Sequence, residues 1–188
     1  MQYIIDLKQH VGQTVELKGW VSNKRSGKGL FFIVLRDGSG FCQCVVDEKK
    51  VSAESFESAK QATMESAISL KGIVIKDEKQ MGGFEIQVES CGLISIAEEF
   101  PIAKKEHGVD FLMDNRHLWI RSRRQWAILR IRNRIIMAIH EFFQAQGFVQ
   151  ADAPIFTGNS CEGTSTLFET DFYGEPAYLS QSGQLYGE

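Results

Sequence analysis

Hydrophobic residues recur at strand spacing through the first half of the chain, either alternating with polar residues or in short apolar runs between turns. The strands that this pattern predicts span residues 14–21, 30–35, 41–46, 67–76 and 84–89. Between the third and fourth strands, residues 52–65 predict a helix, because Ser52 can cap its N-terminus and no glycine or proline interrupts it. The first half therefore predicts five strands and one helix.

Three strands, one helix and two more strands are the element order of an OB-fold barrel, a small closed β-barrel. The exposed strand face of such a barrel binds single-stranded oligonucleotides. The pattern by itself leaves another small β-barrel or a β-sandwich open. We assign residues 1–97 to this all-β domain.

The second half of the chain has helical spacing instead. A helix is expected over residues 122–146, and its apolar stripe consists of Ile128, Ile131, Ile135, Ile139 and Phe142. Several arginines crowd its first half, which fits a solvated face with salt bridges and also a contact with RNA or a partner subunit. Gly147 should end the helix in the left-handed conformation. An extended segment over residues 148–156, with Pro154 favouring a strand edge, and a strand at residues 177–180 should follow. Residues 98–120, polar and without periodicity at their start, predict a linker.

Composition restricts the function classes. The formal net charge is −3, whereas a protein that coats phosphate non-specifically is usually strongly basic. Binding of nucleic acid would therefore depend on a local patch and on contacts to base edges. The cysteines lack C-x-x-C spacing, so we expect reduced thiols and no metal site. No apolar run is long enough to span a membrane, and the N-terminus lacks the pattern of a secretory signal, so we expect a cytoplasmic protein.

Three segments carry a resemblance to a known family. Residues 19–46 read GWVSNKRSGKGLFFIVLRDGSGFCQCVV and resemble the anticodon-binding OB domain of the aspartyl- and asparaginyl-tRNA synthetases. Residues 146–188 contain QGFVQADAPIFTGNSCEGTSTLF and AYLSQSGQLYGE, which are similar to the opening of the class II catalytic domain of that subfamily. Residues 114–126 are similar to the stretch that joins the two domains. The resemblance implies an OB barrel over residues 1–97, a linker over 98–120, and over 121–188 the beginning of an α+β catalytic domain with an incomplete antiparallel sheet.

The resemblance also implies roles in reading an anticodon. Phe32 would stack on the middle anticodon base, and Gln43 would read that base through its amide. Arg25 would be a basic contact in the preceding loop, and Glu85 would accept from the N–H groups of a guanine at the first anticodon position. From local chemistry alone, Phe32 would more simply be a core residue, and Gln43 and Arg25 ordinary surface residues.

In the second half, the resemblance implies an amino-acid pocket and a dimer interface. The predicted pocket residues are Glu162, which would bind the substrate ammonium group, together with Ser180, Gln181, Gln184 and Glu188. The first class II signature, with Gly147, Phe148 and Pro154, would form the interface of a homodimer. Local chemistry alone explains the same residues as a hydrogen-bonded turn and as a helix followed by a strand.

The loop at the end of the chain favours asparagine over aspartate. An aspartyl enzyme of this family places a lysine here after a proline, whereas this sequence has Gly183 and then Glu188. A carboxylate repels the side chain of aspartate but accepts a hydrogen bond from the carboxamide of asparagine. Glu188 is therefore the candidate for recognising the amide.

The function that follows from the resemblance is asparagine–tRNA ligase, which uses ATP and Mg²⁺ to join L-asparagine to tRNA-Asn. The second and third class II signatures are not found in the sequence. We therefore expect the catalytic residues downstream of Glu188 and expect these residues alone to be inactive. A non-catalytic tRNA-binding OB module and an aspartyl or non-discriminating synthetase remain as alternatives.

Overall fold

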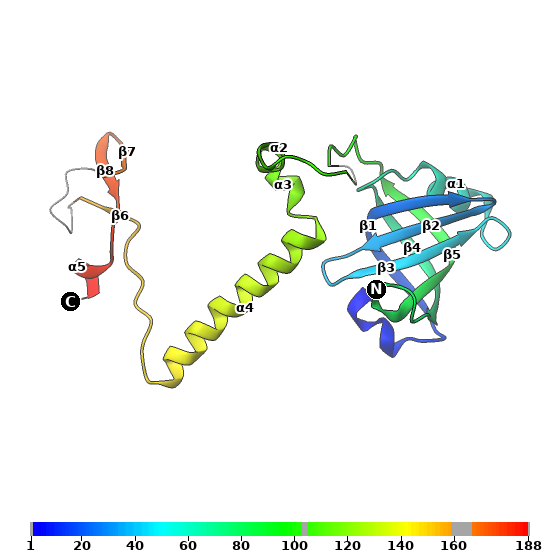
Figure 1. Ribbon diagram of the computed structural model, residues 1–188, viewed down its shortest axis with the longest axis horizontal. Coiled ribbons are helices and arrows are strands. Elements are labelled where there is room, and N and C mark those ends of the chain that lie inside the picture. The colour runs from blue at the N-terminus through cyan, green and yellow to red at the C-terminus, as the bar shows by residue number, and fades with distance from the viewer. Residues whose placement is uncertain (1, 103–104, 159–166, 188) are drawn as a thin grey trace. The chain divides into compact units, whose positions relative to one another are not determined.

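A computed structural model describes residues 2–102, 105–158 and 167–187 (Figure 1). The chain forms two compact units, Met1–Gly108 and Val109–Glu188. Among the described residues, no helix is both long and apolar enough to cross a membrane.

The first unit is a closed five-stranded barrel (Figure 1). Its strands are β1 (Thr14–Gly27), β2 (Leu30–Arg36), β3 (Phe41–Asp47), β4 (Ala67–Lys76) and β5 (Phe84–Ser95), in the spatial order β1-β2-β3-β5-β4. The pair β3–β5 is parallel and the other pairs are antiparallel. Between strands lie helix α1 (Ala53–Gln61) and the short 3-10 helix η2 (Met81–Gly83), and the 3-10 helix η1 (Ile4–Gln9) precedes β1. The predicted element order is confirmed, and a sandwich is excluded.

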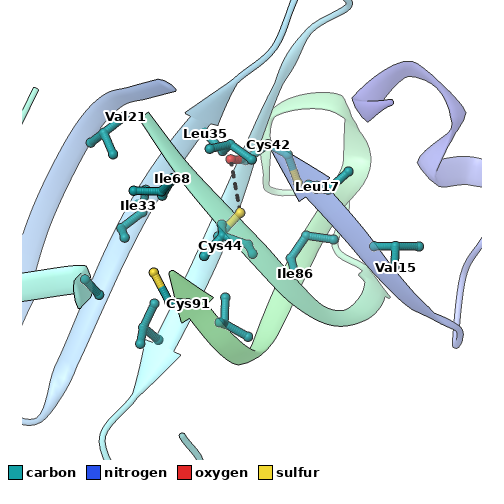
Figure 2. Packing of buried hydrophobic residues seen from close by; sticks show 14 of the residues in the cluster. Val15, Leu17, Val21, Ile33, Leu35, Cys42, Cys44, Ile68, Ile86 and Cys91 are labelled. Atoms are coloured by element: carbon teal, nitrogen blue, oxygen red, sulfur yellow. Dashed lines mark hydrogen bonds between the residues drawn. The ribbon is translucent and has the colours of Figure 1, made fainter. Parts of the chain in front are cut away.

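Alternate residues of each strand fill the barrel interior. Leu17, Ile33 and Leu35 are fully buried there, and Figure 2 shows them with Cys42 and Cys44, which lie two residues apart on one face of β3. The residues between these buried positions face outward, since neighbouring residues of a strand point to opposite sides of the sheet. The sequence therefore gives each strand an apolar side that the closed barrel covers.

A bulge in β1 changes which of its residues face outward. Val21 pairs with Leu35, but Asn23 pairs with Val34, so one extra residue enters β1 between these pairs. After the bulge, Lys24 lies on the core side, opposite the buried Ile33. A bulge inserts one unpaired residue and re-aims the side chains that follow it. The bulge therefore sets the direction of the last third of β1.

Helix α1 is shorter than the predicted helix over residues 52–65. The Ser52 hydroxyl caps its N-terminus as predicted, accepting from the Ser55 N–H at 3.2 Å. The helix ends at Gln61, and Glu65 has a φ of 64°, which a helix excludes. The buried Ser66 hydroxyl accepts from the Thr63 N–H at 3.0 Å and holds the turn. The prediction over residues 62–65 is wrong because this tertiary turn competes with the helix.

The second unit consists of helices and one small sheet. The helices are α2 (Val109–Asp114), α3 (Arg116–Trp119), α4 (Arg123–Ala145) and α5 (Gln184–Gly187), and the strands are β6 (Phe156–Thr157), β7 (Glu169–Phe172) and β8 (Glu175–Leu179). The antiparallel sheet has the order β6-β8-β7. Helices α2 and α3 lie within the predicted linker 98–120. In the extended segment 148–156, Phe156 pairs with Leu179 and the Ile155 carbonyl accepts from the Ser180 N–H at 2.9 Å. Strand β8 confirms the strand expected at residues 177–180, whereas β7 was not anticipated.

Helix α4 has well-defined ends. The Ser122 hydroxyl accepts from the Gln125 N–H at the N-terminus. At the C-terminus, the Gly147 N–H donates to Gln144 and the Phe148 N–H donates to Phe143, with Gly147 at a φ of 86°. These are the two hydrogen bonds of a Schellman motif, and the packing of the Phe143 and Phe148 rings at 5.4 Å accompanies it. The predicted left-handed end of the helix at Gly147 is confirmed.

Candidate nucleic-acid interface

Strand register brings the four predicted anticodon residues together on the outer face of the barrel. Arg25 of β1 pairs with Phe32 of β2, and Gln43 of β3 pairs with Glu85 of β5. Gln43 also pairs with Val34, which lies two residues from Phe32 on the same side of β2. Arg25 with Phe32 and Gln43 with Glu85 thus occupy neighbouring rows of the sheet.

Phe32 and Gln43 point to the same side of the barrel wall. In β2, Ile33 is fully buried, and Phe31 packs on the core with its ring 4.9 Å from that of Phe56 in α1. In β3 the neighbours of Gln43, Cys42 and Cys44, are the core residues. Phe32 therefore faces outward and Phe31 takes the inward position, so the interpretation of Phe32 as a core residue is wrong.

A chain of polar contacts joins three of the four residues. The Arg25 guanidinium donates from Nη2 to Gln43 Oε1 at 3.5 Å, and Gln43 Nε2 donates to Glu85 Oε2 at 2.7 Å. The Arg25 guanidinium also lies over the Phe32 ring, 6.0 Å from the ring centroid. Gln43 is only 7% exposed, whereas Arg25 is exposed. We call Arg25, Phe32, Gln43 and Glu85 the platform cluster.

The platform cluster has the chemical groups that a splayed base requires. An aromatic ring offers a surface for stacking, and an amide carries both a donor and an acceptor for a base edge. A guanidinium attracts phosphate, while a carboxylate accepts from base N–H groups. Because the cation and the carboxylate flank the amide, the local charge is balanced, which agrees with a chain of net charge −3.

Sequence reasoning missed a neighbouring group on the same outer face. Trp20 of β1 pairs with Arg36 of β2, whose guanidinium lies 5.2 Å from the indole and forms a 2.6 Å ion pair with Glu65. Trp20 is 43% exposed, although it packs under Arg36. The sequence contained a signal for this group. Trp20 occupies a position of β1 at which the alternating pattern predicts an outward, polar residue.

The three described cysteines are core residues rather than reactive groups. Cys42, Cys44 and Cys91 are buried free thiols. Hydrogen bonding with Cys42 and burial raise the pKa of the Cys44 thiol well above its usual range, and burial raises the pKa of Cys91 to about 11. Both thiols are therefore protonated at neutral pH, and a protonated thiol is a poor nucleophile and metal ligand.

The predicted amino-acid pocket lies only partly within the described residues. Ser180 follows β8, and its hydroxyl donates to the carbonyl of Ser182 at 2.7 Å, while the Gln184 N–H lies 3.4 Å from the Ser182 hydroxyl. Ser180 and Gln181 thus lie in the turn after β8, and Gln184 begins α5 at the end of that turn. Glu162 and Glu188 lie outside the described residues, so the pocket as a whole stays a prediction.

The three predicted interface residues follow the end of α4. Gly147 and Phe148 form the Schellman turn, and Pro154 lies exposed in the segment before β6. Phe148 is 63% exposed and helps to line a hollow of about 310 Å³ at the end of α4. An apolar side chain this exposed is available to a partner, and the homodimer stays a prediction.

Two family profiles match the chain in succession. The first, described as an OB-fold nucleic acid binding domain, covers residues 15–94. The second, described as tRNA synthetases class II (D, K and N), covers residues 108–188. Residues 95–107 lie between the two matches.

Similar proteins agree with the two profiles. Asparagine–tRNA ligase of Symbiobacterium thermophilum is 57% identical over 183 residues, 97% of this chain and 42% of the relative. That of Sorangium cellulosum is 54% identical over 97% of this chain and 41% of the relative. The crystal structure of asparaginyl-tRNA synthetase from Pyrococcus horikoshii complexed with asparaginyl-adenylate has a TM-score of 0.88 at 36% identity, covering 98% of this chain and 43% of that chain.

The chain thus spans about two fifths of the length of these relatives. The barrel with its platform cluster, the class II elements after it and the whole-chain similarity all agree. The chain belongs to the asparaginyl-tRNA synthetase family, of which it carries the OB-fold domain and the first part of the class II synthetase domain.

Proposed function

We propose that this chain is the anticodon-reading part, with the start of the catalytic domain, of an asparagine–tRNA ligase. The observation that carries the proposal is the platform cluster, in which an outward aromatic ring lies beside an amide flanked by a guanidinium and a carboxylate. The chain is similar over nearly its whole length to proteins named asparagine–tRNA ligase, which supports asparagine as the substrate amino acid.

The barrel would hold an unstacked anticodon loop on its outer face. The ring of Phe32 stacks on the middle base, a contact that contributes about 1–3 kcal/mol and does not distinguish between bases. Gln43 supplies the distinction through its amide, and Arg25 draws the backbone toward the ring. Glu85 accepts from a guanine at the first position. This division of tasks separates affinity, which comes from the ring and the cation, from selectivity, which comes from the amide.

The complete enzyme would carry out two steps, transfer of an adenylyl group to asparagine and then transfer of the asparaginyl group to tRNA. The asparagine carboxylate attacks the α-phosphorus of ATP, pyrophosphate leaves, and asparaginyl-adenylate forms. A hydroxyl of the terminal ribose of tRNA-Asn then attacks the acyl carbon, and AMP leaves. Magnesium bound with ATP would offset phosphate charge, but the described residues of this chain contain no group of three possible metal ligands. We therefore assign it no residue here.

Residues of the second unit would contribute to the substrate pocket and to assembly. Ser180, Gln181 and Gln184 are proposed to line the asparagine pocket with Glu162 and Glu188. Two copies would pair through the first class II signature, which places Gly147, Phe148 and Pro154 at a homodimer interface. With its reduced thiols, the protein is proposed to act in the cytoplasm.

The test is a titration of the chain with an anticodon stem-loop of tRNA-Asn. Phe32→Ala and Gln43→Ala should each raise the Kd by about 5- to 100-fold, because one removes the stacking surface and the other the base-edge contact. Tyr173→Ala, which removes an exposed aromatic ring from the second unit, serves as the control and should leave the Kd unchanged. If both platform variants bound the stem-loop like the parent, the assignment of the anticodon site would be wrong.

A further inference from the structure

The Gln43 amide is held by two groups of opposite character. Its Nε2 atom donates to Glu85 at 2.7 Å, and its Oε1 atom accepts from Arg25 at 3.5 Å. A carboxylate only accepts hydrogen bonds and a guanidinium only donates them. Reversal of the amide would put Oε1 against the Glu85 carboxylate and Nε2 against the Arg25 guanidinium, which mismatches both contacts. One orientation of the amide is therefore strongly preferred.

The two contacts differ in strength. The bond between Gln43 and Glu85 is short and charge-assisted, and it lies where Gln43 is only 7% exposed. The contact with Arg25 is at the limit of a hydrogen bond, and the Arg25 side chain is exposed. An incoming base can therefore displace or share the Arg25 contact, whereas Glu85 keeps its hold on Nε2. Oε1 and the second Nε2 hydrogen then remain for the base, in a fixed order.

A fixed order matters because uracil and cytosine differ by an exchange of donors and acceptors. Uracil has an acceptor oxygen at position 4 and a donor N–H at position 3, whereas cytosine has a donor amino group and an acceptor nitrogen at these positions. A freely reversing amide could satisfy either base that stacks on Phe32. An amide of one orientation matches one of the two and mismatches the other.

Resting on the proposed function, we infer that Glu85 is a positioning residue that fixes the Gln43 amide so that the platform cluster accepts uracil and rejects cytosine at the middle anticodon position. The asparagine codons AAU and AAC require uracil at that position. This role is distinct from a direct contact of Glu85 with the first base. Glu85 is the appropriate group because the parallel register of β3 and β5 sets it beside Gln43.

The experiment compares binding of two stem-loops that differ only in uracil or cytosine at the middle position. The parent chain should prefer uracil by about 5- to 100-fold. Glu85→Gln keeps the size of the side chain but can donate as well as accept, so the ratio of the two Kd values should approach one, chiefly through tighter binding of the cytosine loop. Glu89→Gln changes an exposed carboxylate farther along β5 and should keep the parental ratio.

A second variant separates positioning from direct contact. In Gln43→Ala the ratio should already be near one, and adding Glu85→Gln should not change it further. If Glu85→Gln weakened both loops equally and kept the preference for uracil, Glu85 would act only on the first base and the inference would be overturned. A parent chain that bound neither loop, or both alike, would instead contradict the proposed function.

The free protein offers a readout that needs no RNA. In an NMR spectrum of the parent, the two side-chain amide protons of Gln43 should have well-separated shifts, because one is held by a carboxylate and the other is not. The separation should shrink in Glu85→Gln, while the backbone signals of the barrel show that the variant is folded. Unchanged Gln43 side-chain signals in a folded variant would contradict the positioning role.

Discussion

The two units of this chain bury their apolar side chains in different ways. Every buried hydrophobic residue in the described part of the chain lies in the first unit, at or before Cys91. In the second unit the apolar stripe of α4 is exposed, with Ile131 and Phe142 each 61% and Ile135 55% accessible. Both units have the apolar periodicity that their secondary structure requires, but only the barrel closes around it.

The difference separates local from tertiary stabilisation. Helix α4 is defined by its Ser122 cap, its Schellman end and its 23-residue length, all of which are local. The barrel depends on strand pairs and on a core contributed by all five strands. Local sequence can therefore specify a helix whose apolar face is still exposed. A closed barrel requires pairing between strands that are distant in the sequence. The exposed stripe of α4 therefore remains available for burial against further protein surface.

The largest contrast between the units should come from truncating one apolar side chain in each. Leu35→Ala removes a fully buried side chain and should lower the free energy of unfolding of the barrel by about 2–5 kcal/mol. Ile135→Ala, on the exposed stripe of α4, should change it by no more than about 0.5 kcal/mol. Urea unfolding followed by Trp20 fluorescence, with Trp119 and Trp126 replaced by phenylalanine, measures both effects on the barrel.

A second measurement tests whether the apolar stripe of α4 is exposed in solution, as the contrast between the two units requires. Helix content by circular dichroism, recorded over a range of protein concentrations, reports whether the stripe is buried in solution. A concentration-dependent loss of stability in Ile135→Ala would show that α4 has a partner, such as a second copy of the chain.

Alkaline pH should destabilise the barrel through its buried thiols. An unfolded Cys91 ionises near its ordinary pKa of 9.0, whereas burial raises the pKa in the fold to about 11. Stability is therefore complete below pH 9, falls as the unfolded chain loses its proton, and decreases by about 2 kcal/mol by pH 11. Urea unfolding at several pH values should show a shallower decline for Cys91→Ala than for the parent. Parallel curves would remove Cys91 from this role.

Loss of a polar contact should also destabilise the barrel more than the second unit, by a smaller amount than loss of a buried apolar side chain. Lys24 Nζ donates to the carbonyls of Ala59, Lys60 and Ala62 at the end of α1, so Lys24→Met should cost the barrel about 1–2 kcal/mol. Burial lowers the pKa of this ammonium group, so its charge already carries a desolvation cost that the three carbonyls offset.

The matched substitution in the second unit is Arg134→Met. Its ion pair with Glu141, at 3.3 Å, is exposed on both sides, so the change should be within about 0.5 kcal/mol. Thermal unfolding of each unit, monitored by NMR, compares the two variants. Equal effects would mean that burial does not decide the strength of these contacts.

Sequence reasoning succeeded where one short-range pattern determines the structure. Alternation located the five barrel strands, although β1 and β5 each run six residues past their predicted ends at Val21 and Glu89. The residues flanking α4 located the ends of that helix. Both signals depend on neighbours within a few positions. It failed at residues 62–65, where the buried Ser66 holds a turn. It also missed β7 and the two short helices α2 and α3, which lack a strong periodic pattern.

For the candidate site, too, the sequence indicates the residues, and the tertiary structure sets where their side chains lie. The residue types of the platform cluster and the outward position of Phe32 could be proposed from the sequence through a family resemblance. Simple alternation from Val21, however, puts Arg25 on the inside of the barrel. Only the bulge before Asn23 turns Arg25 outward to meet Phe32.

Taken alone, the sequence determined the strands, the helix caps and the identities of the groups that could read a base, since these depend on local spacing and side-chain chemistry. The tertiary structure decided which of these groups meet. The parallel pairing of β3 with β5 joins Gln43 to Glu85 across 42 positions of sequence. Such a contact is set by the closure of the barrel, and no local pattern in either strand encodes it.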